Sequence, residues 1–163
     1  MSEKDRLFRS PTFVASDFTF DDRVVRVFPD MIQRSVPGYA LVVPLTALLA
    51  RRYAQDSSLL YDLGCSLGSA SLAMSDAVSA RDTAIVAVDN SAPMIEAFRR
   101  LLADREAPGS VPIHPRCADL QDTHIDRASV VVLNFTLQFI EPAARPAVLG
   151  KICAGLLPDG ALV

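Results

Sequence analysis

From residue 58 onward, short apolar runs alternate with stretches in which apolar residues recur at helical spacing. Four runs have the length and composition of β-strands: 58–64, 83–91, 111–120 and 128–139. The third contains Pro112 and Pro115, which favour an edge position because proline cannot donate a ladder hydrogen bond. The fourth is apolar enough to be covered on both faces. The pattern predicts an α/β fold with a parallel sheet and helices on both of its faces.

The stretches between these runs are expected to be helices, and some of their ends are marked in the sequence. One helix follows a glycine turn and runs to about Val78. The next is expected to be capped by Ser91, with Pro93 in its first turn. A helix over 141–157 is expected to end at the sequence PDG, after which ALV opens a fifth strand.

The N-terminal part of the chain has a different pattern. Residues 1–20 are expected to be irregular. The sequence DDRVVRVFPDMIQRSV is expected to form short helical pieces broken at Pro29 and again before Pro37, since proline removes a helix hydrogen bond. A helix is expected from Gly38 to Arg52, with Pro44 inside it.

Composition and charge narrow the class of protein. Half of the 163 residues are hydrophobic and 21% are charged, which is typical of one folded domain. We expect a helical lid at about 1–55 and an α/β core at about 56–163. The net charge of −3 gives no basic surface, so neither nucleic acid nor a membrane is expected as a direct partner. The longest apolar stretches are shorter than the ~20 residues that span a bilayer.

The cysteines and histidines indicate neither a disulfide framework nor a metal site. Cys65, Cys117 and Cys153 lack CxxC spacing, and scattered thiols fit a reducing compartment. His114 and His124 have no metal-binding pattern around them. We therefore expect a cytoplasmic protein without a metal. No base lies within sequence reach of Cys65, so its backbone is expected to matter more than its thiol.

The sequence YDLGCSLGSASLAM joins the first strand to its helix through a turn with two glycines. A phosphate-binding loop would need GxxxxGK[ST], and no lysine lies near Gly64. A dinucleotide fingerprint would need glycine where Ser66 and Ser69 stand. The register that fits is GxGxG with an acid two residues upstream and one serine in place of glycine: Asp62, Gly64, Ser66 and Gly68. This turn is typical of proteins that bind S-adenosylmethionine, a ligand without a phosphate.

Two acids at predicted strand ends complete a candidate nucleoside site. Ligands of parallel α/β sheets bind beyond the carboxyl ends of the strands. Asp89 is placed to accept hydrogen bonds from both ribose hydroxyls, and Asp119 from the adenine amino group. The alternative is that each acid only caps a helix or closes a turn. The polar clusters around Gly64, Asp89 and Asp119 all fall at the ends of predicted strands, and this coincidence favours the nucleoside site.

Four segments resemble the carboxy-S-adenosylmethionine synthase family, bacterial enzymes of wobble-uridine modification: TFDDRVVRVFPDMIQRSVPGY, YDLGCSLG, VDNSAPMIE and ASVVVLNFTLQF. The resemblance runs from about residue 5 to the last residue, and FPDMIQRSVPGY and LNFTLQF are not shared with ordinary methyltransferases. It implies a doubly wound, Rossmann-like methyltransferase fold. It also implies an S-adenosylmethionine site without a metal or a protein nucleophile, formed by Tyr39, Gly64, Cys65, Ser66, Asp89, Asn90, Asp119, Leu120 and Asn134.

The resemblance also implies a reaction. Prephenate loses its carboxylate as carbon dioxide and gives phenylpyruvate. The methyl group of S-adenosylmethionine, deprotonated to a sulfonium ylide, captures that carbon dioxide. The product, carboxy-S-adenosylmethionine, is expected to serve a tRNA-modifying partner that makes 5-oxyacetyl uridine, and the family implies a homodimer.

Family members continue for a further third beyond the position of Val163, with the last strands of the sheet and an arginine for the carboxylate. We can place neither Arg34 nor Arg99 in that role from the sequence. We therefore expect a chain that is incomplete at its C-terminal end. An ordinary S-adenosylmethionine-dependent methyltransferase, or an inactive fragment that binds the same ligand, is the alternative.

Overall fold

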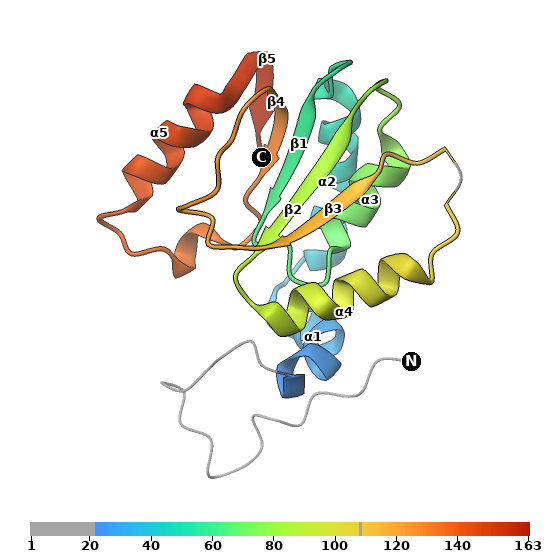
Figure 1. The fold of residues 1–163 in the computed structure, drawn as a ribbon. Coiled ribbons are helices and arrows are strands. Elements are labelled where there is room, and N and C mark those ends of the chain that lie inside the picture. Colours follow the sequence, from blue (N-terminus) through green and yellow to red (C-terminus); the bar gives the residue numbers. More distant parts are fainter. Residues whose placement is uncertain (1–21, 108) are drawn as a thin grey trace.

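Five parallel strands form one sheet in the computed structural model, which describes residues 22–107 and 109–163 (Figure 1). The irregular structure expected for residues 1–20 lies outside the described residues. The strands are β1 (Leu59–Leu63), β2 (Ala84–Asp89), β3 (Ile113–Cys117), β4 (Ala128–Val132) and β5 (Leu156–Leu162). The sheet and its helices confirm the predicted doubly wound, Rossmann-like α/β fold.

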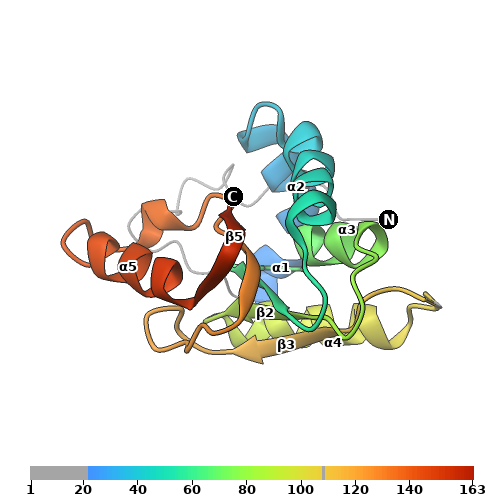
Figure 2. The same cartoon turned by 90° about the horizontal axis from the view of Figure 1, so that it is seen from above.

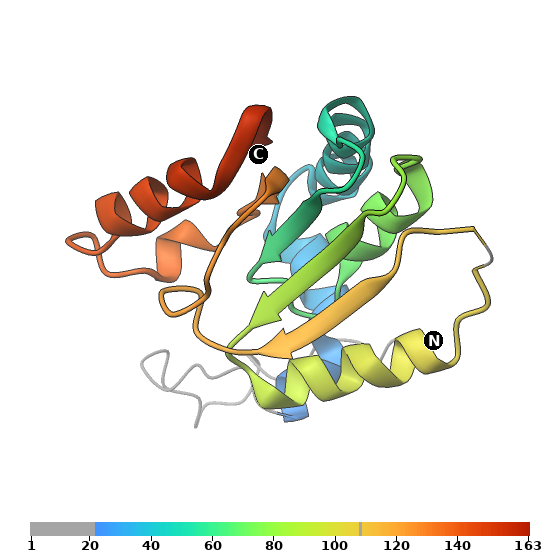
Figure 3. The same ribbon diagram turned by 45° about the horizontal axis from the view of Figure 1, so that its top comes forward.

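The order of the strands across the sheet is β3-β2-β1-β4-β5. The chain moves outward from β1 to β3, then returns to the other side of β1 for β4 and β5. Figure 3 shows β1, β2 and β3 running in the same direction, with their arrowheads at one edge. The strand order therefore reverses between β1 and β4, and ligands of such sheets bind at that point, beyond the carboxyl ends.

Within residues 22–107 and 109–163, five α-helices and one short 3₁₀ helix surround the sheet: α1 (Asp22–Ser35), α2 (Tyr39–Tyr53), α3 (Ser69–Ala77), α4 (Ala92–Ala103), η3 (Leu137–Phe139) and α5 (Arg145–Gly155). Figure 2 shows α2 and α3 on one side of the sheet and α5 on the other. None of the helices within the described ranges combines the length and the apolarity needed to cross a membrane.

Alternate residues of β1 and β2 point to opposite helix layers, as the period of a strand requires. Leu60 and Ile85 belong to a buried cluster that includes Ala50 of α2 and Met74 of α3. Ala87 packs with Phe98 of α4 on the same face. These contacts place α2, α3 and α4 over one face of the sheet.

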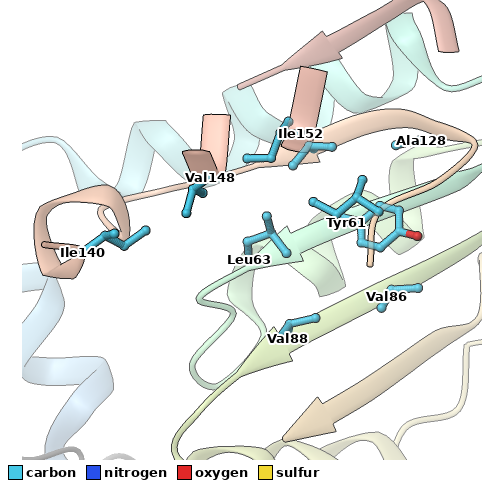
Figure 4. Close-up of a cluster of buried hydrophobic side chains, with 10 residues drawn as sticks. Tyr61, Leu63, Val86, Val88, Ala128, Ile140, Val148 and Ile152 are labelled. Atoms are coloured by element: carbon cyan, nitrogen blue, oxygen red, sulfur yellow. The ribbon is translucent and has the colours of Figure 1, made fainter. Parts of the chain in front are cut away.

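The other face of β1 and β2 packs against α5 (Figure 4). The cluster consists of Tyr61, Leu63, Val86, Val88, Ile125, Ala128, Val131, Ile140, Val148 and Ile152. Burying a large aliphatic side chain contributes about 1.5–3 kcal/mol, so this layer is a main source of stability. All five residues of β4 are buried, which confirms that this strand is covered on both faces.

The prolines near the N-terminal end do not break the helices. α1 continues through Pro29, so the predicted break there is wrong. Its buried residues Val24, Phe28 and Met31 pack against Met94 of α4, and this burial offsets the single hydrogen bond that proline removes. The following helix, α2, begins at Tyr39 and runs through Pro44 in agreement with the prediction.

Two further predictions, a helix cap and an edge strand, are confirmed. Ser91 caps α4, because its side chain accepts a hydrogen bond from the backbone N–H of Met94 at 3.3 Å. β3 lies at an edge of the sheet, as its prolines predicted.

The predicted ends of the last two strands and of the helix between them are wrong. β4 stops at Val132, seven residues before the predicted end at 139, and the chain then turns out of the sheet. The helix is also shorter than predicted, because α5 ends at Gly155. β5 begins at Leu156 and contains the PDG sequence, which sits at an irregularity in the pairing between β4 and β5.

Candidate ligand-binding site

A cavity of about 450 Å³ opens where the strand order reverses. Its walls come from the carboxyl ends of the strands and from α1 and α2, and its volume lies in the range of small-molecule sites. All nine residues predicted from the sequence line it: Tyr39, Gly64, Cys65, Ser66, Asp89, Asn90, Asp119, Leu120 and Asn134. The fold thus brings the predicted site together, and the contacts of these residues with a ligand stay a prediction.

The turn after β1 needs glycine at its first position. Gly64 has φ +83°, and a Cβ atom there would overlap the side chain of Thr136. The backbone N–H groups of Gly64 and Cys65 both donate to the carbonyl oxygen of Val88, at 2.8 and 3.0 Å. Ser66, at the position where the motif usually has glycine, also has positive φ, +48°. The turn therefore keeps a glycine-like backbone with a serine in it.

Asp62 fixes the end of β1 to the start of α3. Its Oδ2 accepts hydrogen bonds from the backbone N–H and the hydroxyl of Ser71, at 3.0 and 2.6 Å. Burial raises the pKa of Asp62 to about 6, the Ser71 hydrogen bonds oppose that rise, and the charge of Asp89 adds to it. The acid upstream of the glycine turn thus stabilises the turn from inside the protein.

Asp89 holds two backbone amides at the end of β2. Its Oδ2 accepts from the N–H of Ser66 and its Oδ1 from the N–H of Ser91, both at 2.9 Å. Burial raises the pKa of Asp89, and these two hydrogen bonds oppose the rise. A carboxylate offers about four lone-pair positions, so two remain for hydroxyl donors of a ligand. Asp89 is therefore a turn acid that still has acceptor capacity toward the cavity.

Asp119 lies two residues beyond the end of β3. Its Oδ1 accepts from the backbone N–H of Gln121 at 2.7 Å, which makes it a turn acid too. Its neighbour Leu120 packs against the apolar cluster between the sheet and α5. Asp119 and Leu120 thus form one end of the cavity, on the side of the edge strand.

The segment after β4 is tied to both α2 and β1. Asn134 Nδ2 donates to Thr46 Oγ1 at 3.1 Å, and Thr46 Oγ1 in turn donates to the carbonyl of Val42 at 2.9 Å. Thr136 Oγ1 lies 2.8 Å from the carbonyl oxygen of Leu63 and 3.1 Å from that of Asn134. These hydrogen bonds hold the loop at the mouth of the cavity.

Aromatic residues of this loop and of α2 meet at the cavity. The rings of Tyr39 and Phe135 have centroids 6.2 Å apart and are tilted by 38°. Phe135 has φ +56°, which is a costly conformation for a bulky residue. Sequence reasoning noted LNFTLQF as a segment but singled out only Asn134, so Phe135, Thr136 and Thr46 were missed. The unusual segment itself could have indicated Phe135 and Thr136, whereas Thr46 lies outside it, in α2.

The charged residues that line the cavity are acidic. Asp62, Asp89 and Asp119 are among its lining residues, and no lysine or arginine of residues 22–107 and 109–163 is. Arg34 pairs with Asp30 at 3.2 Å, and Arg99 donates to a backbone carbonyl of β3. The described lining therefore suits a ligand with a positive charge and with hydrogen-bond donors.

Cys65 is buried beside this acidic lining. Burial raises the pKa of its thiol, and the charges of Asp62 and Asp89 raise it further. The thiol is therefore protonated near neutral pH and is a poor nucleophile. The thiol thus gives no sign of a nucleophilic role, and the role expected for the backbone of Cys65 stays a prediction.

The sheet order, the glycine turn and the strand-end acids define a methyltransferase-like protein. A sequence profile described as "Methyltransferase domain" matches residues 60–160, and the chain belongs to this family. Among curated proteins, the chain is 55% identical over 159 residues to carboxy-S-adenosyl-L-methionine synthase of Geobacter sp. (strain M21). It is 48% identical over 163 residues to the protein of the same name in Klebsiella pneumoniae.

These two matches cover 98% and 100% of this chain. The chain spans 65% of the length of each of the two relatives.

Solved structures agree on the fold. DesVI of Streptomyces venezuelae matches with a TM-score of 0.62 and 19% identity, over 89% of this chain and 57% of its own. The magnesium protoporphyrin IX methyltransferase of Synechocystis, solved with bound S-adenosylmethionine, matches with a TM-score of 0.58 and 19% identity. That match covers 73% of this chain and 55% of the methyltransferase.

Proposed function

We propose that the cavity binds S-adenosylmethionine across the carboxyl ends of four strands. The strand order β3-β2-β1-β4 sets the order in which the adenine, the ribose and the methionine part of the ligand lie along the cavity. Adenine lies at Asp119 beyond β3 and the ribose at Asp89 beyond β2. The methionine part passes over the glycine turn after β1 and reaches Asn134 after β4. The observation that supports this best is the convergence of all nine predicted residues on one cavity.

We further propose that the protein is a carboxy-S-adenosylmethionine synthase that uses prephenate. The support is the shared name of the relatives at 48% and 55% identity over nearly the whole chain. Aromatisation of the prephenate ring releases carbon dioxide and the ring hydroxyl as hydroxide, and leaves phenylpyruvate. Hydroxide takes a proton from the S-methyl group, forming water and a sulfonium ylide. The ylide carbon then bonds to carbon dioxide, which gives carboxy-S-adenosylmethionine.

This reaction asks the residues of the chain for positioning rather than for covalent catalysis. Asp89 and Asp119 fix the nucleoside, and the loop around Asn134 fixes the methionine end, so that the methyl carbon faces the second substrate. The apolar residues of α1 that line the cavity keep bulk water from an ylide that water would protonate. The new carboxylate of the product also needs a cation, which the resemblance assigns to an arginine of the family.

The assembly and the surroundings of the protein are part of the proposal. We propose a helical lid at about 1–55 over an α/β core at about 56–163, a homodimer, and a cytoplasmic setting. The product passes to a separate tRNA-modifying enzyme, and the protein itself does not bind tRNA.

Prephenate labelled with heavy carbon at its ring carboxylate tests the proposed reaction. The protein is incubated with this prephenate and S-adenosylmethionine, and the products are identified by mass spectrometry. We expect the label in carboxy-S-adenosylmethionine and unlabelled phenylpyruvate. Production of S-adenosylhomocysteine with an added acceptor would instead show an ordinary methyltransferase. Bound S-adenosylmethionine without any turnover would show a binding protein only.

A further inference from the structure

Phe135 adopts a backbone conformation that its side chain does not favour. Its φ of +56° lies in the left-handed region, which a bulky residue enters only where its surroundings enforce it. Hydrogen bonds on both sides do so: Asn134 is bonded to Thr46, and Thr136 to the carbonyl of Leu63. Strain of this kind collects at functional sites, which raises the question of what the ring does.

The ring of Phe135 forms an aromatic pair at the cavity. Phe135 and Tyr39 both line the cavity, with ring centroids 6.2 Å apart. Phe135 is still 37% exposed, so the core does not account for its ring. The two residues come from α2 and from the loop after β4, which the hydrogen bond between Asn134 and Thr46 joins. The pair is thus held in place by elements far apart in the sequence.

The position of the pair along the cavity is set by the strand order. With the nucleoside at β3 and β2, the groups beyond the ribose reach β1 and then β4. Phe135 and Tyr39 therefore lie at the end of the cavity opposite Asp119. In the proposed ligand, that end holds the sulfonium centre and the methionine chain.

We infer that the rings of Tyr39 and Phe135 form an aromatic face that recognises the positive charge of the sulfonium centre. The inference rests on the proposed S-adenosylmethionine site. The negative face of an aromatic ring attracts a cation, and the attraction is greater where water is excluded. The described lining has acids and no lysine or arginine that would compete for the ring faces. Phe135 is then a specificity-determining residue that favours a sulfonium over a neutral thioether.

Binding measurements on two ligands separate this role from simple packing. S-adenosylmethionine carries the sulfonium charge, and S-adenosylhomocysteine is the neutral thioether. We expect Phe135→Leu and Tyr39→Leu to weaken S-adenosylmethionine binding about 3- to 30-fold more than S-adenosylhomocysteine binding, measured by calorimetry. Phe135→Tyr and Tyr39→Phe keep a ring at each position and should keep the wild-type ratio of the two dissociation constants.

A second pair of variants tests the strain independently of the ring. Phe135→Gly and Phe135→Ala both remove the ring and should lose the same part of the ligand preference. Glycine is normally less stabilising than alanine, but it is favoured at positive φ. We therefore expect the glycine variant to have the higher melting temperature of the two.

Each result bears on the inference. An equal loss of affinity for both ligands in the leucine variants would overturn it and would leave the proposed site intact. An alanine variant more stable than the glycine variant would overturn the claim that the backbone at Phe135 is strained. A wild-type protein that binds neither ligand would overturn the proposed function itself, and this inference with it.

Discussion

Replacing Gly64 by alanine should destabilise the protein much more than the loss of one glycine usually does. Alanine at φ +83° costs about 1–2 kcal/mol in backbone energy. The new Cβ would also overlap Thr136, whose hydroxyl bonds to the buried carbonyl of Leu63. Moving that side chain costs about 1–3 kcal/mol in packing and about 0.5–1.5 kcal/mol for the hydrogen bond. We expect a total of about 2.5–6.5 kcal/mol, a large share of a typical stability of about 5–15 kcal/mol.

Urea unfolding of Gly64→Ala and Gly38→Ala measures the contribution of the contact. Gly38 has φ +80°, and an alanine Cβ there would meet nothing within 4 Å, so its substitution should cost only the backbone part, about 1–2 kcal/mol. In a Thr136→Ala background, most of the overlapping atoms are gone, and the additional cost of Gly64→Ala should shrink. Equal destabilisation at Gly64 and Gly38 would refute the argument from Thr136.

Three further substitutions test the site. Asp89→Ala should weaken S-adenosylmethionine binding by about 1.5–3 kcal/mol, because a charged hydrogen-bond partner is lost; unchanged affinity by calorimetry would show a turn acid only. Burial raises the pKa of Asp62 from 3.8 to about 6, so the folded protein holds this proton more tightly than the unfolded chain. Stability should therefore fall by about 3 kcal/mol as pH rises through this window, and Asp62→Asn should remove that decrease in urea titrations. Thr46→Val removes the acceptor of Asn134 Nδ2 and should weaken ligand binding severalfold by calorimetry, whereas Thr46→Ser should not.

The sequence was sufficient for the parts of the fold that depend on local pattern. Strand β2 ends at Asp89 as expected, because its apolar run stops there. Ser91 and the prolines of β3 also acted as predicted, since caps and missing N–H groups are local properties. The strand-end acids could be found for the same reason.

The errors arise where distant contacts decide the structure. Pro29 stays inside α1 because that helix packs on Met94 of α4, and no local signal reports such packing. The apolar sequence after β4 reads as a continued strand, but Thr136 and Asn134 anchor it to β1 and α2 instead. The aromatic pair of the cavity depends on the same anchoring, which explains why Phe135 was not predicted.

The double hydrogen bonding of Asp89 has a consequence for how this protein family changes over time. Two backbone amides require the carboxylate whether or not a ligand binds. A descendant that had lost its ligand would therefore still be selected to keep an acid at this position. Phe135 is under the opposite pressure, because its backbone favours glycine or asparagine. After loss of ligand binding, Phe135 would therefore be substituted sooner than Asp89. The residue at position 135 is the better indicator of whether a relative still binds the ligand.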